Sequence, residues 1–331
     1  MTRASNPLAA AAALAALALL AGCSSAAAGG SANAAAAAKP KIVYIPGLTG
    51  NPFYTTVSCG AQTEARKLGA DFTTQGASTF DVAKQTEIVN AAVAAKPAAI
   101  MISITDPKAM IVPLTQARQA GIKIIAIDGD LVDTSVMTTD IQADGVQGGE
   151  LAGDALAKIV GYKGTVMTID NAAGSLVAKA RTDGFEKAIA KYPAMKFIGI
   201  QYSANDTAKA ASIAASAATT NPDLVGIFSA ETNNTEGAIT GVREAAKTGK
   251  VHVVGYDTSD PIVAALKNGT LDGTVVQNPR GEGALGVQSA MDALAGRTVP
   301  RDQQSDQVFA TPQNVGDANV QKYIYDVNCT S

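Results

Sequence analysis

From Lys41 onward, short β-branched apolar runs alternate regularly with Ala-rich amphipathic stretches, and this alternation most constrains the fold. The runs are nearly continuous, as in strands buried on both faces, and the stretches between them have helical spacing. The pattern predicts an α/β fold with parallel sheets. The expected strands are 41–45, 72–74, 98–104, 123–127, 165–169, 196–200, 224–228, 252–256 and 271–277. The expected helices include one ending at Leu68, one over 81–95 and one over 147–160.

The length of 331 residues exceeds the usual size of one hydrophobic core and favours two lobes. The Gly-containing stretch 142–146 divides the expected strands into two groups, which predicts two doubly wound lobes. The net charge is −3 and there is no dense Lys/Arg cluster. Nucleic-acid affinity depends on such basic clusters, so we expect no nucleic-acid binding.

The N-terminus has the pattern of a secretory signal. Arg3 precedes an Ala/Leu run over 8–21, which ends in Leu20-Ala-Gly-Cys23. The run is too short for a spanning helix, and its end is typical of a bacterial lipobox in which Cys23 is lipidated after cleavage. We therefore expect a lipoprotein signal peptide over 1–23, a flexible tether over 24–40, and export to the outer face of the cytoplasmic membrane. The alternative is a buried helix that happens to end in Cys.

Because Cys23 is expected to carry the lipid, two cysteines remain in an oxidising compartment, Cys59 and Cys329. One interpretation is a disulfide, which would constrain the unfolded chain by about 5 kcal/mol in the chain-entropy model. The alternative is two separately buried thiols.

Acidic residues follow several expected strands. They are Asp128, Asp130, Asp170, Glu231 and Asp257. Ligands of open parallel sheets bind beyond the carboxyl ends of the strands. Carboxylates accept hydroxyl hydrogen bonds, so a group of them favours a polyhydroxylated ligand. Taken singly, each acid has the alternative of a cap or turn residue.

The turn after the first strand reads Asn51-Pro-Phe-Tyr54. Asn51 is expected to cap a helix with Pro52 at its first position, and one of the two adjacent rings is expected to face the ligand cleft. An aromatic face covers the apolar side of a sugar ring.

Arg181 lies near the opening of another expected helix, where the helix dipole opposes a cation. This position favours a role in binding ligand hydroxyls or the cleft acids, with a solvated surface Arg as the alternative. Gln277 ends another strand and is a candidate for contact with the ligand or for a place at the hinge.

The sequence contains few of the residue arrangements that enzymes use. His252 is the single histidine and lies in an apolar run, so His-based metal clusters and Ser-His-Asp arrangements are excluded. The pattern 281–286, Gly-Glu-Gly-Ala-Leu-Gly, matches the dinucleotide fingerprint and follows an expected strand, but no second strand with a terminal acid follows at the required distance, so it is interpreted as helix packing. We expect no catalytic residue, cofactor or metal. A secreted glycoside hydrolase that uses two of Asp128, Glu231 and Asp257 is the enzyme alternative.

Several motifs, in order and spacing, are similar to one family over nearly all of residues 41–310. They are Asn51-Pro-Phe-Tyr54, Ile127-Asp128, Gly148-Gly-Glu-Leu-Ala-Gly-Asp154, Arg181-Thr-Asp-Gly-Phe185, Val254-Gly-Tyr-Asp257 and Val276-Gln277. The chain resembles the ribose-binding type of periplasmic sugar-binding protein, which serves ATP-binding-cassette importers. The resemblance implies a type I periplasmic binding protein fold and a ligand cleft between two lobes. The implied ligand contacts are Asn51, Phe53, Tyr54, Asp128, Arg181, Asp257 and Gln277.

Three positions depart from the ribose-binding pattern: Gly129 replaces Arg, Asn205 replaces Phe, and Glu231 replaces Asn. We expect Asp130, Asn205 and Glu231 to contact the ligand as well. The exchanges make the pocket more acidic and remove an apolar wall, which favours a larger or more hydroxylated ligand than ribose.

The resemblance also implies a hinge crossed three times, with one lobe over 41–143 plus 278–305 and the other over 144–277 plus 306–331. The expected partners are a sugar or polyol, an importer permease, and the membrane through the lipid anchor only, and the protein is expected to be a monomer. Sugar-responsive repressors share this fold but carry a helix-turn-helix where this chain has a lipobox. A lipoprotein receptor that signals to a membrane partner is the remaining alternative.

Overall fold

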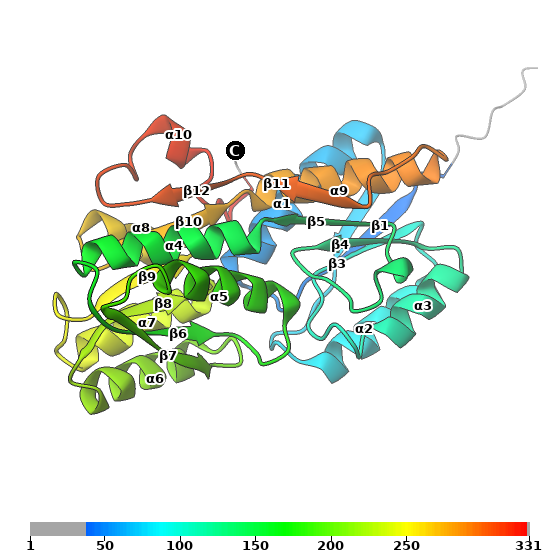
Figure 1. Ribbon diagram of the computed structural model, residues 1–331. Coiled ribbons are helices and arrows are strands. Elements are labelled where there is room, and N and C mark those ends of the chain that lie inside the picture. The colour runs from blue at the N-terminus through cyan, green and yellow to red at the C-terminus, as the bar shows by residue number, and fades with distance from the viewer. Residues whose placement is uncertain (1–37, 330–331) are drawn as a thin grey trace, which may run out of the picture. The chain divides into compact units, whose positions relative to one another are not determined.

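The computed structural model describes residues 38–329, and within them the strands form two six-stranded sheets. The first sheet contains β1 (Lys41–Ile45), β2 (Asp71–Thr74), β3 (Ala99–Ile102), β4 (Lys123–Ile127), β5 (Thr139–Ala143) and β11 (Asp302–Ser305). The second contains β6 (Gly164–Asp170), β7 (Met195–Tyr202), β8 (Leu224–Ser229), β9 (His252–Tyr256), β10 (Gly273–Gln277) and β12 (Gln307–Ala310). Their orders are β11-β5-β4-β3-β1-β2 and β12-β10-β9-β8-β6-β7. Figure 1 shows the two sheets in two lobes, which confirms the predicted fold class.

Helices cover both faces of each sheet. The first lobe has α1 (Pro52–Leu68), α2 (Val82–Ala95), α3 (Ile111–Gln119) and α9 (Pro279–Leu294), with a short 3-10 turn at Thr134–Val136. The second lobe has α4 (Gly145–Ile159), α5 (Leu176–Ile189), α6 (Thr207–Thr220), α7 (Thr232–Glu244) and α8 (Asp260–Lys267), and α10 (Ala318–Gln321) follows β12.

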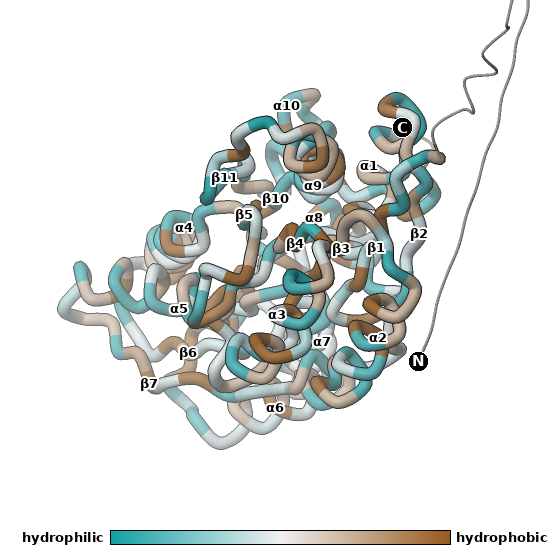
Figure 2. The backbone as a smooth tube through the Cα atoms, turned by 90° about the vertical axis from the view of Figure 1, so that its right-hand side faces the viewer, coloured by the Kyte–Doolittle hydropathy of each residue, from teal (hydrophilic) through white to brown (hydrophobic). Residues whose placement is uncertain are grey.

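The strand period explains how one sheet serves two helical layers. In β1, Ile42 and Tyr44 pack with the core that includes α1 and α9, whereas Val43 and Ile45 pack with the core of α2 and α3. Each helix contains both hydrophobic and hydrophilic residues, as a helix with one buried face requires (Figure 2).

Glycines bring the helices into close contact. A Cβ on Gly283 of α9 would lie 2.0 Å from the carbonyl oxygen of Val57 in α1, and one on Gly60 would lie 2.0 Å from that of Arg280. No side chain fits at either position without a shift of the backbone. The interpretation of 281–286 as helix packing is therefore confirmed.

Within the described residues the chain passes between the sheets after β5, after β10 and between β11 and β12. The segment that follows β12 differs from the expectation that all of 306–331 belongs to the second lobe. Its end returns to the first lobe, where Cys329 is joined to Cys59 of α1 by a disulfide, with 4.9 Å between the two Cα atoms.

Five strands differ from the sequence-based expectation. The strands β5, β11 and β12 were not expected, because their sequences carry polar residues, as in Asp-Gln-Gln-Ser of β11, and they pair through the backbone. The strands β2 and β7 are edge strands with partly exposed residues, so they are not buried on both faces. The strand β12 is also antiparallel to its neighbour β10.

The expected signal peptide, its Cys23 and the tether as far as residue 37 lie outside the described residues. Among residues 38–329, none of the helices combines the length and the apolar character that crossing a membrane requires.

Candidate functional site

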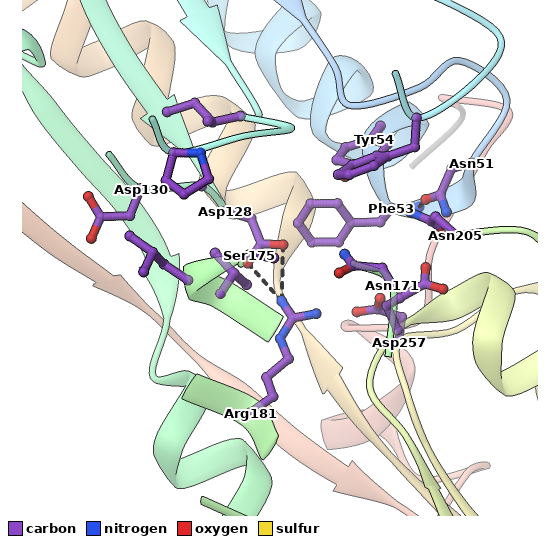
Figure 3. Close-up of a pocket in the computed structure, with 17 residues that line it drawn as sticks. Asn51, Phe53, Tyr54, Asp128, Asp130, Asn171, Ser175, Arg181, Asn205 and Asp257 are labelled. Carbon is purple, nitrogen blue, oxygen red and sulfur yellow. Dashed lines mark hydrogen bonds and ion pairs between the residues drawn. The ribbon is translucent and has the colours of Figure 1, made fainter. Parts of the chain in front are cut away.

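A pocket lies where the carboxyl ends of the strands of both sheets meet. Figure 3 shows its lining side chains converging from the two lobes. The predicted site residues that line it are Asn51, Phe53, Tyr54, Asp128, Asp130, Arg181, Asn205, Glu231 and Asp257.

The first turn of α1 forms one wall of the pocket. Asn51 caps the helix as expected, because its side-chain oxygen accepts a 2.9 Å hydrogen bond from the backbone N–H of Phe53, and Pro52 follows it. Phe53 and Tyr54 both line the pocket, so both of the rings that the resemblance names lie there, and not only the one that helix geometry required. Their rings meet edge to face, with centroids 5.4 Å apart and planes at 82°.

Asp128 and Arg181 join the two walls. Asp128 follows β4 with a left-handed φ of 45°, and one guanidinium nitrogen of Arg181 donates to its two carboxylate oxygens at 2.8 and 3.0 Å. Arg181 is the sixth residue of α5, beyond the first turn, so the argument from the helix dipole does not apply to it. Burial raises the pKa of Asp128, and the neighbouring guanidinium opposes that shift.

Further contacts fix the direction of the Arg181 guanidinium. It donates to the carbonyl oxygen of Ala230 at 3.0 Å and to Oε1 of Gln277 at 3.2 Å, and it lies over the ring of Tyr256, 4.2 Å from the centroid. Its Nε is buried and has no hydrogen-bond partner among the described residues. The side chain is therefore preorganised beside the pocket.

Asp257 follows β9, also with a left-handed φ of 70°. Its Oδ1 accepts hydrogen bonds from Gln277 at 2.8 Å and from the hydroxyl of Tyr325 at 2.6 Å, and its Oδ2 accepts one from Thr232 at 3.1 Å. Gln277 is fully buried behind the pocket wall, where it links Arg181 to Asp257. The structure therefore gives Gln277 the contacts of a residue that supports other site residues.

Glu231 caps α7, and its carboxylate accepts hydrogen bonds from the backbone N–H groups of Asn233 at 3.1 Å and Asn234 at 2.8 Å. Burial raises the pKa of Glu231 to about 8, although these backbone donors act in the opposite direction. The amide nitrogen of Asn205, in the orientation that satisfies both groups, lies 2.9 Å from Oε2 of Glu231. Two of the three departures from the ribose-binding pattern, Asn205 and Glu231, thus contact each other.

Two further strand-end acids lie differently. The carboxylate of Asp130 points away from the Arg181–Asp128 pair, and its Oδ1 accepts from the backbone N–H of Leu131 at 2.7 Å (Figure 3). Asp170 is buried among other partners, because its carboxylate accepts from the backbone N–H of Asn171 at 2.6 Å and from Thr182 at 3.0 Å. Asp170 therefore stabilises the second lobe through these hydrogen bonds.

The lining also contains Gly129, which the sequence had marked as a departure, and residues that sequence reasoning missed: Phe80, Ile104, Pro107, Asn171, Ser175, Leu176 and Val177. Most of these residues lie in loops after strands, and that position was the signal that could have found them. Tyr325, near the end of the chain, supports Asp257 without any signal in the local sequence.

Among residues 38–329, no cluster of three or more His, Cys, Asp or Glu is arranged to hold a metal ion. His252 lies away from this pocket, half-buried, with its Nδ1 2.9 Å from Asp272. The pocket instead combines carboxylates, amides, one guanidinium and aromatic rings. Such a set binds hydroxyl groups and the apolar face of a small ring.

Comparison with known proteins places this geometry in context. The sequence matches the family described as the periplasmic binding protein domain over residues 42–298. It is 30% identical over 262 residues to the ribose import binding protein of Escherichia coli, which covers 79% of this chain and 87% of that protein.

Two solved structures share the fold over most of the chain. An ABC transporter solute binding protein from Agrobacterium vitis, bound with alpha-D-tagatopyranose, is 34% identical with a TM-score of 0.85, and the match covers 87% of this chain and 100% of that chain. A carbohydrate transporter solute binding protein from Agrobacterium radiobacter, in complex with D-arabinose, is 30% identical with a TM-score of 0.83, and that match covers 87% and 99%.

Proposed function

Because the chain belongs to the periplasmic binding protein family, we propose that it captures a monosaccharide or a similar polyol between its two lobes and delivers it to an ABC permease. The observation that carries this proposal is a single pocket lined from both sheets by carboxylates, amides and aromatic rings. A ligand that contacts both lobes favours the arrangement in which they are closed over it. The permease would recognise that closed arrangement.

The polar groups suit a neutral polyhydroxylated ligand. Arg181 neutralises Asp128, while Asp257 has three protein donors and retains capacity to accept a ligand hydroxyl. Phe53 and Tyr54 supply the apolar surface against which a sugar ring packs. We propose that the ligand is bound by Asn51, Phe53, Tyr54, Asp128, Asp130, Arg181, Asn205, Glu231 and Asp257, with Gln277 in support.

Three departures from the ribose-binding pattern favour a ligand other than ribose. A Cβ at Gly129 would lie 2.6 Å from the backbone nitrogen of Ile104, so the Arg found in ribose binders does not fit there without a backbone shift. Asn205 supplies polar atoms where the pattern has Phe, and Glu231 supplies a carboxyl group where the pattern has the amide of Asn. We therefore propose a hexose or a hexose-sized polyol, the class to which the tagatose bound by the Agrobacterium vitis protein belongs.

The protein is proposed to act without catalysis, as a monomer exported through its signal peptide and anchored by lipid on Cys23 at the outer face of the cytoplasmic membrane. The sequence Leu20-Ala-Gly-Cys23 supports this anchoring. A Cys23→Ala variant should appear without a lipid-modified N-terminus and leave the membrane fraction. Retention of Cys23→Ala in washed membranes would contradict the lipid anchor.

A thermal-shift screen tests the ligand, followed by calorimetry on each hit. The panel contains D-tagatose, D-arabinose, D-ribose, hexoses, deoxysugars, polyols and cyclitols. A ligand that binds only the folded state raises the melting temperature. Asp257→Asn should weaken the hit, and Asp71→Asn, on the exposed edge strand β2, is the matched control.

If no compound in the panel raises the melting temperature, sugar capture is contradicted. Release of reducing sugar from glycosides would contradict a purely binding role. Uptake of the identified sugar should fall in cells that lack the chain. Unchanged uptake would contradict delivery to a permease and favour the signalling alternative.

A further inference from the structure

The last residues of the described chain connect the two lobes beside the pocket. After α10, residues 322–329 run from the second lobe to α1 of the first, and we call them the C-terminal strap. They lie beyond residues 42–298, the part matched by the family. Their contacts therefore need an explanation of their own.

On the second lobe, the strap reaches the loop after β9. The Tyr325 hydroxyl donates to Oδ1 of Asp257 at 2.6 Å, and the Tyr325 backbone N–H donates to the hydroxyl of Thr258 at 3.1 Å. Tyr325 is only 6% exposed, so this contact is shielded from water. Burial and the neighbouring Asp257 raise the pKa of the Tyr325 hydroxyl, which therefore stays a donor.

On the first lobe, the same residue reaches the aromatic wall. The rings of Tyr325 and Phe53 pack edge to face with centroids 6.0 Å apart. Asp326 accepts from Arg280 of α9 at 3.2 Å, and the disulfide fastens Cys329 to Cys59, on the helix that also carries Phe53. One tyrosine thus contacts a pocket residue of each lobe, and a covalent bond holds its segment in place.

We propose that Tyr325 is a positioning residue of the ligand pocket, and that the Cys59–Cys329 disulfide holds it between Asp257 and Phe53 so that the strap stabilises the ligand-binding arrangement of the lobes. The inference rests on the proposed function. An ionised carboxylate has about four acceptor sites. Tyr325, Gln277 and Thr232 occupy three of them and fix the direction in which Asp257 meets a ligand hydroxyl.

The disulfide makes the contact persistent. While it is intact, the strap cannot leave α1, so Tyr325 stays at a high effective concentration beside Asp257. After reduction, the contacts that remain between the strap and the first lobe include the Tyr325–Phe53 packing and the ion pair of Arg280 and Asp326, whose side chains are 27% and 20% exposed. Reduction should therefore loosen the pocket.

The first test removes the hydroxyl alone. Tyr325→Phe keeps the ring on Phe53 but should raise the Kd for D-tagatose, or for whichever sugar the panel identifies, by about tenfold. Tyr323→Phe is the matched control, because Tyr323 lies in the same strap and is similarly buried, at 8% exposure. Equal Kd values for Tyr325→Phe, Tyr323→Phe and the unmodified protein would overturn the proposal.

A double-mutant cycle separates positioning from general stability. If Tyr325 acts through Asp257, the tenfold effect of Tyr325→Phe should disappear in an Asp257→Ala background, which has no side-chain oxygen to accept from Tyr325. A purely structural role would give the same fold-change in both backgrounds, and that result would overturn the positioning role.

The second test breaks the covalent link. Reduction of the folded protein by dithiothreitol, and the double variant Cys59→Ser with Cys329→Ser, should each weaken sugar binding several-fold. Hydrogen exchange without sugar should also speed up over residues 52–58 and 256–260, while exchange in α6 stays unchanged. If hydrogen exchange is the same in the oxidised and the reduced protein, the proposed role of the strap is overturned, even if no sugar in the panel binds. If exchange is faster after reduction but no sugar in the panel binds, only sugar capture is contradicted.

Discussion

Arg181 of α5 and Asp128 after β4 form an ion pair that crosses from one lobe to the other, with the two carboxylate oxygens at 2.8 and 3.0 Å from one guanidinium nitrogen. Both side chains are largely buried, at 5% and 10% exposure. A buried pair of this kind is costly to break from one side, because the remaining charge stays without a partner. The pair therefore joins the two walls of the pocket, and its contribution depends on both residues.

Asp128→Ala and Arg181→Ala should each weaken sugar binding on the order of a hundredfold. The fold should survive, because the remaining charge can be hydrated when the lobes separate. Calorimetry gives the affinity, and circular dichroism with thermal melting gives the integrity of the fold. Lys179→Ala is the control, since Lys179 pairs with Asp183 on the exposed side of the same helix. Unchanged affinity in either site variant would show that the substituted residue does not contribute to sugar binding.

Glu231 should make the protein less stable as the pH rises. Its pKa is about 8 in the folded protein against an ordinary 4.5, because the side chain is buried. Its contribution is fully present below pH 4.5. Between there and pH 8 the unfolded chain ionises while the folded protein holds the proton, so the unfolding free energy falls. Asp140, with a pKa raised to about 8 by burial, acts in the same direction.

Glu231→Gln should therefore gain melting temperature relative to the unmodified protein between pH 5 and pH 8, by about 2 °C or more. Gln retains an oxygen that can cap α7. Glu87→Gln, at an exposed position of α2, is the control and should keep the original pH dependence. A constant difference between Glu231→Gln and the unmodified protein at every pH would contradict the shifted pKa. The measurement is thermal unfolding without sugar.

Gln277 is expected to act from behind the pocket. Gln277→Leu removes both the donor to Asp257 and the acceptor of Arg181, so two polar residues of the site lose a partner. We expect the Kd for the identified sugar to rise about tenfold or more. Gln75→Leu, at an exposed position after β2, is the control. Calorimetry on both variants checks this, and a normal Kd for Gln277→Leu would show that the bridge is dispensable.

Much of the fold follows from sequence, because buried parallel strands are written as apolar runs. Each of the acids Asp128 and Asp257 could be placed at the carboxyl end of a strand for the same reason, but the two strands belong to different sheets, so only the resemblance to two-lobed binding proteins put both acids at one cleft. The polar strand β11 could not be predicted, because its pairing depends on backbone groups that every sequence has. The local sequence pattern therefore does not predict a strand whose pairing is made by backbone groups alone.

Asp170 and Tyr325 show the corresponding limit for the site. Asp170 ends a strand as Asp128 does, yet its carboxylate is held by Thr182 and a backbone N–H. The direction of a side chain depends on such contacts, which have no signature in a single sequence. Tyr325 is separated from Asp257 by 68 residues, and only the folded path of the C-terminal strap brings them together.

The closest approach between α4 and α5 gives a prediction about stability. A Cβ on Gly149 would lie 1.9 Å from the carbonyl oxygen of Arg181 and 2.7 Å from the backbone nitrogen of Phe185. Gly149→Ala must therefore push apart two helices, one of which positions the Arg181 guanidinium. We expect a loss of about 1–3 kcal/mol in the free energy of unfolding.

Sugar affinity should fall with it, because a displaced α5 moves Arg181 away from Asp128. Gly316→Ala is the matched control, since a Cβ there meets no other atom within 4 Å. Urea unfolding and calorimetry on the two variants test both parts of the prediction. A Gly149→Ala protein as stable as Gly316→Ala would show that the helices can separate without cost, and normal affinity in a destabilised Gly149→Ala would show that Arg181 keeps its place independently of α4.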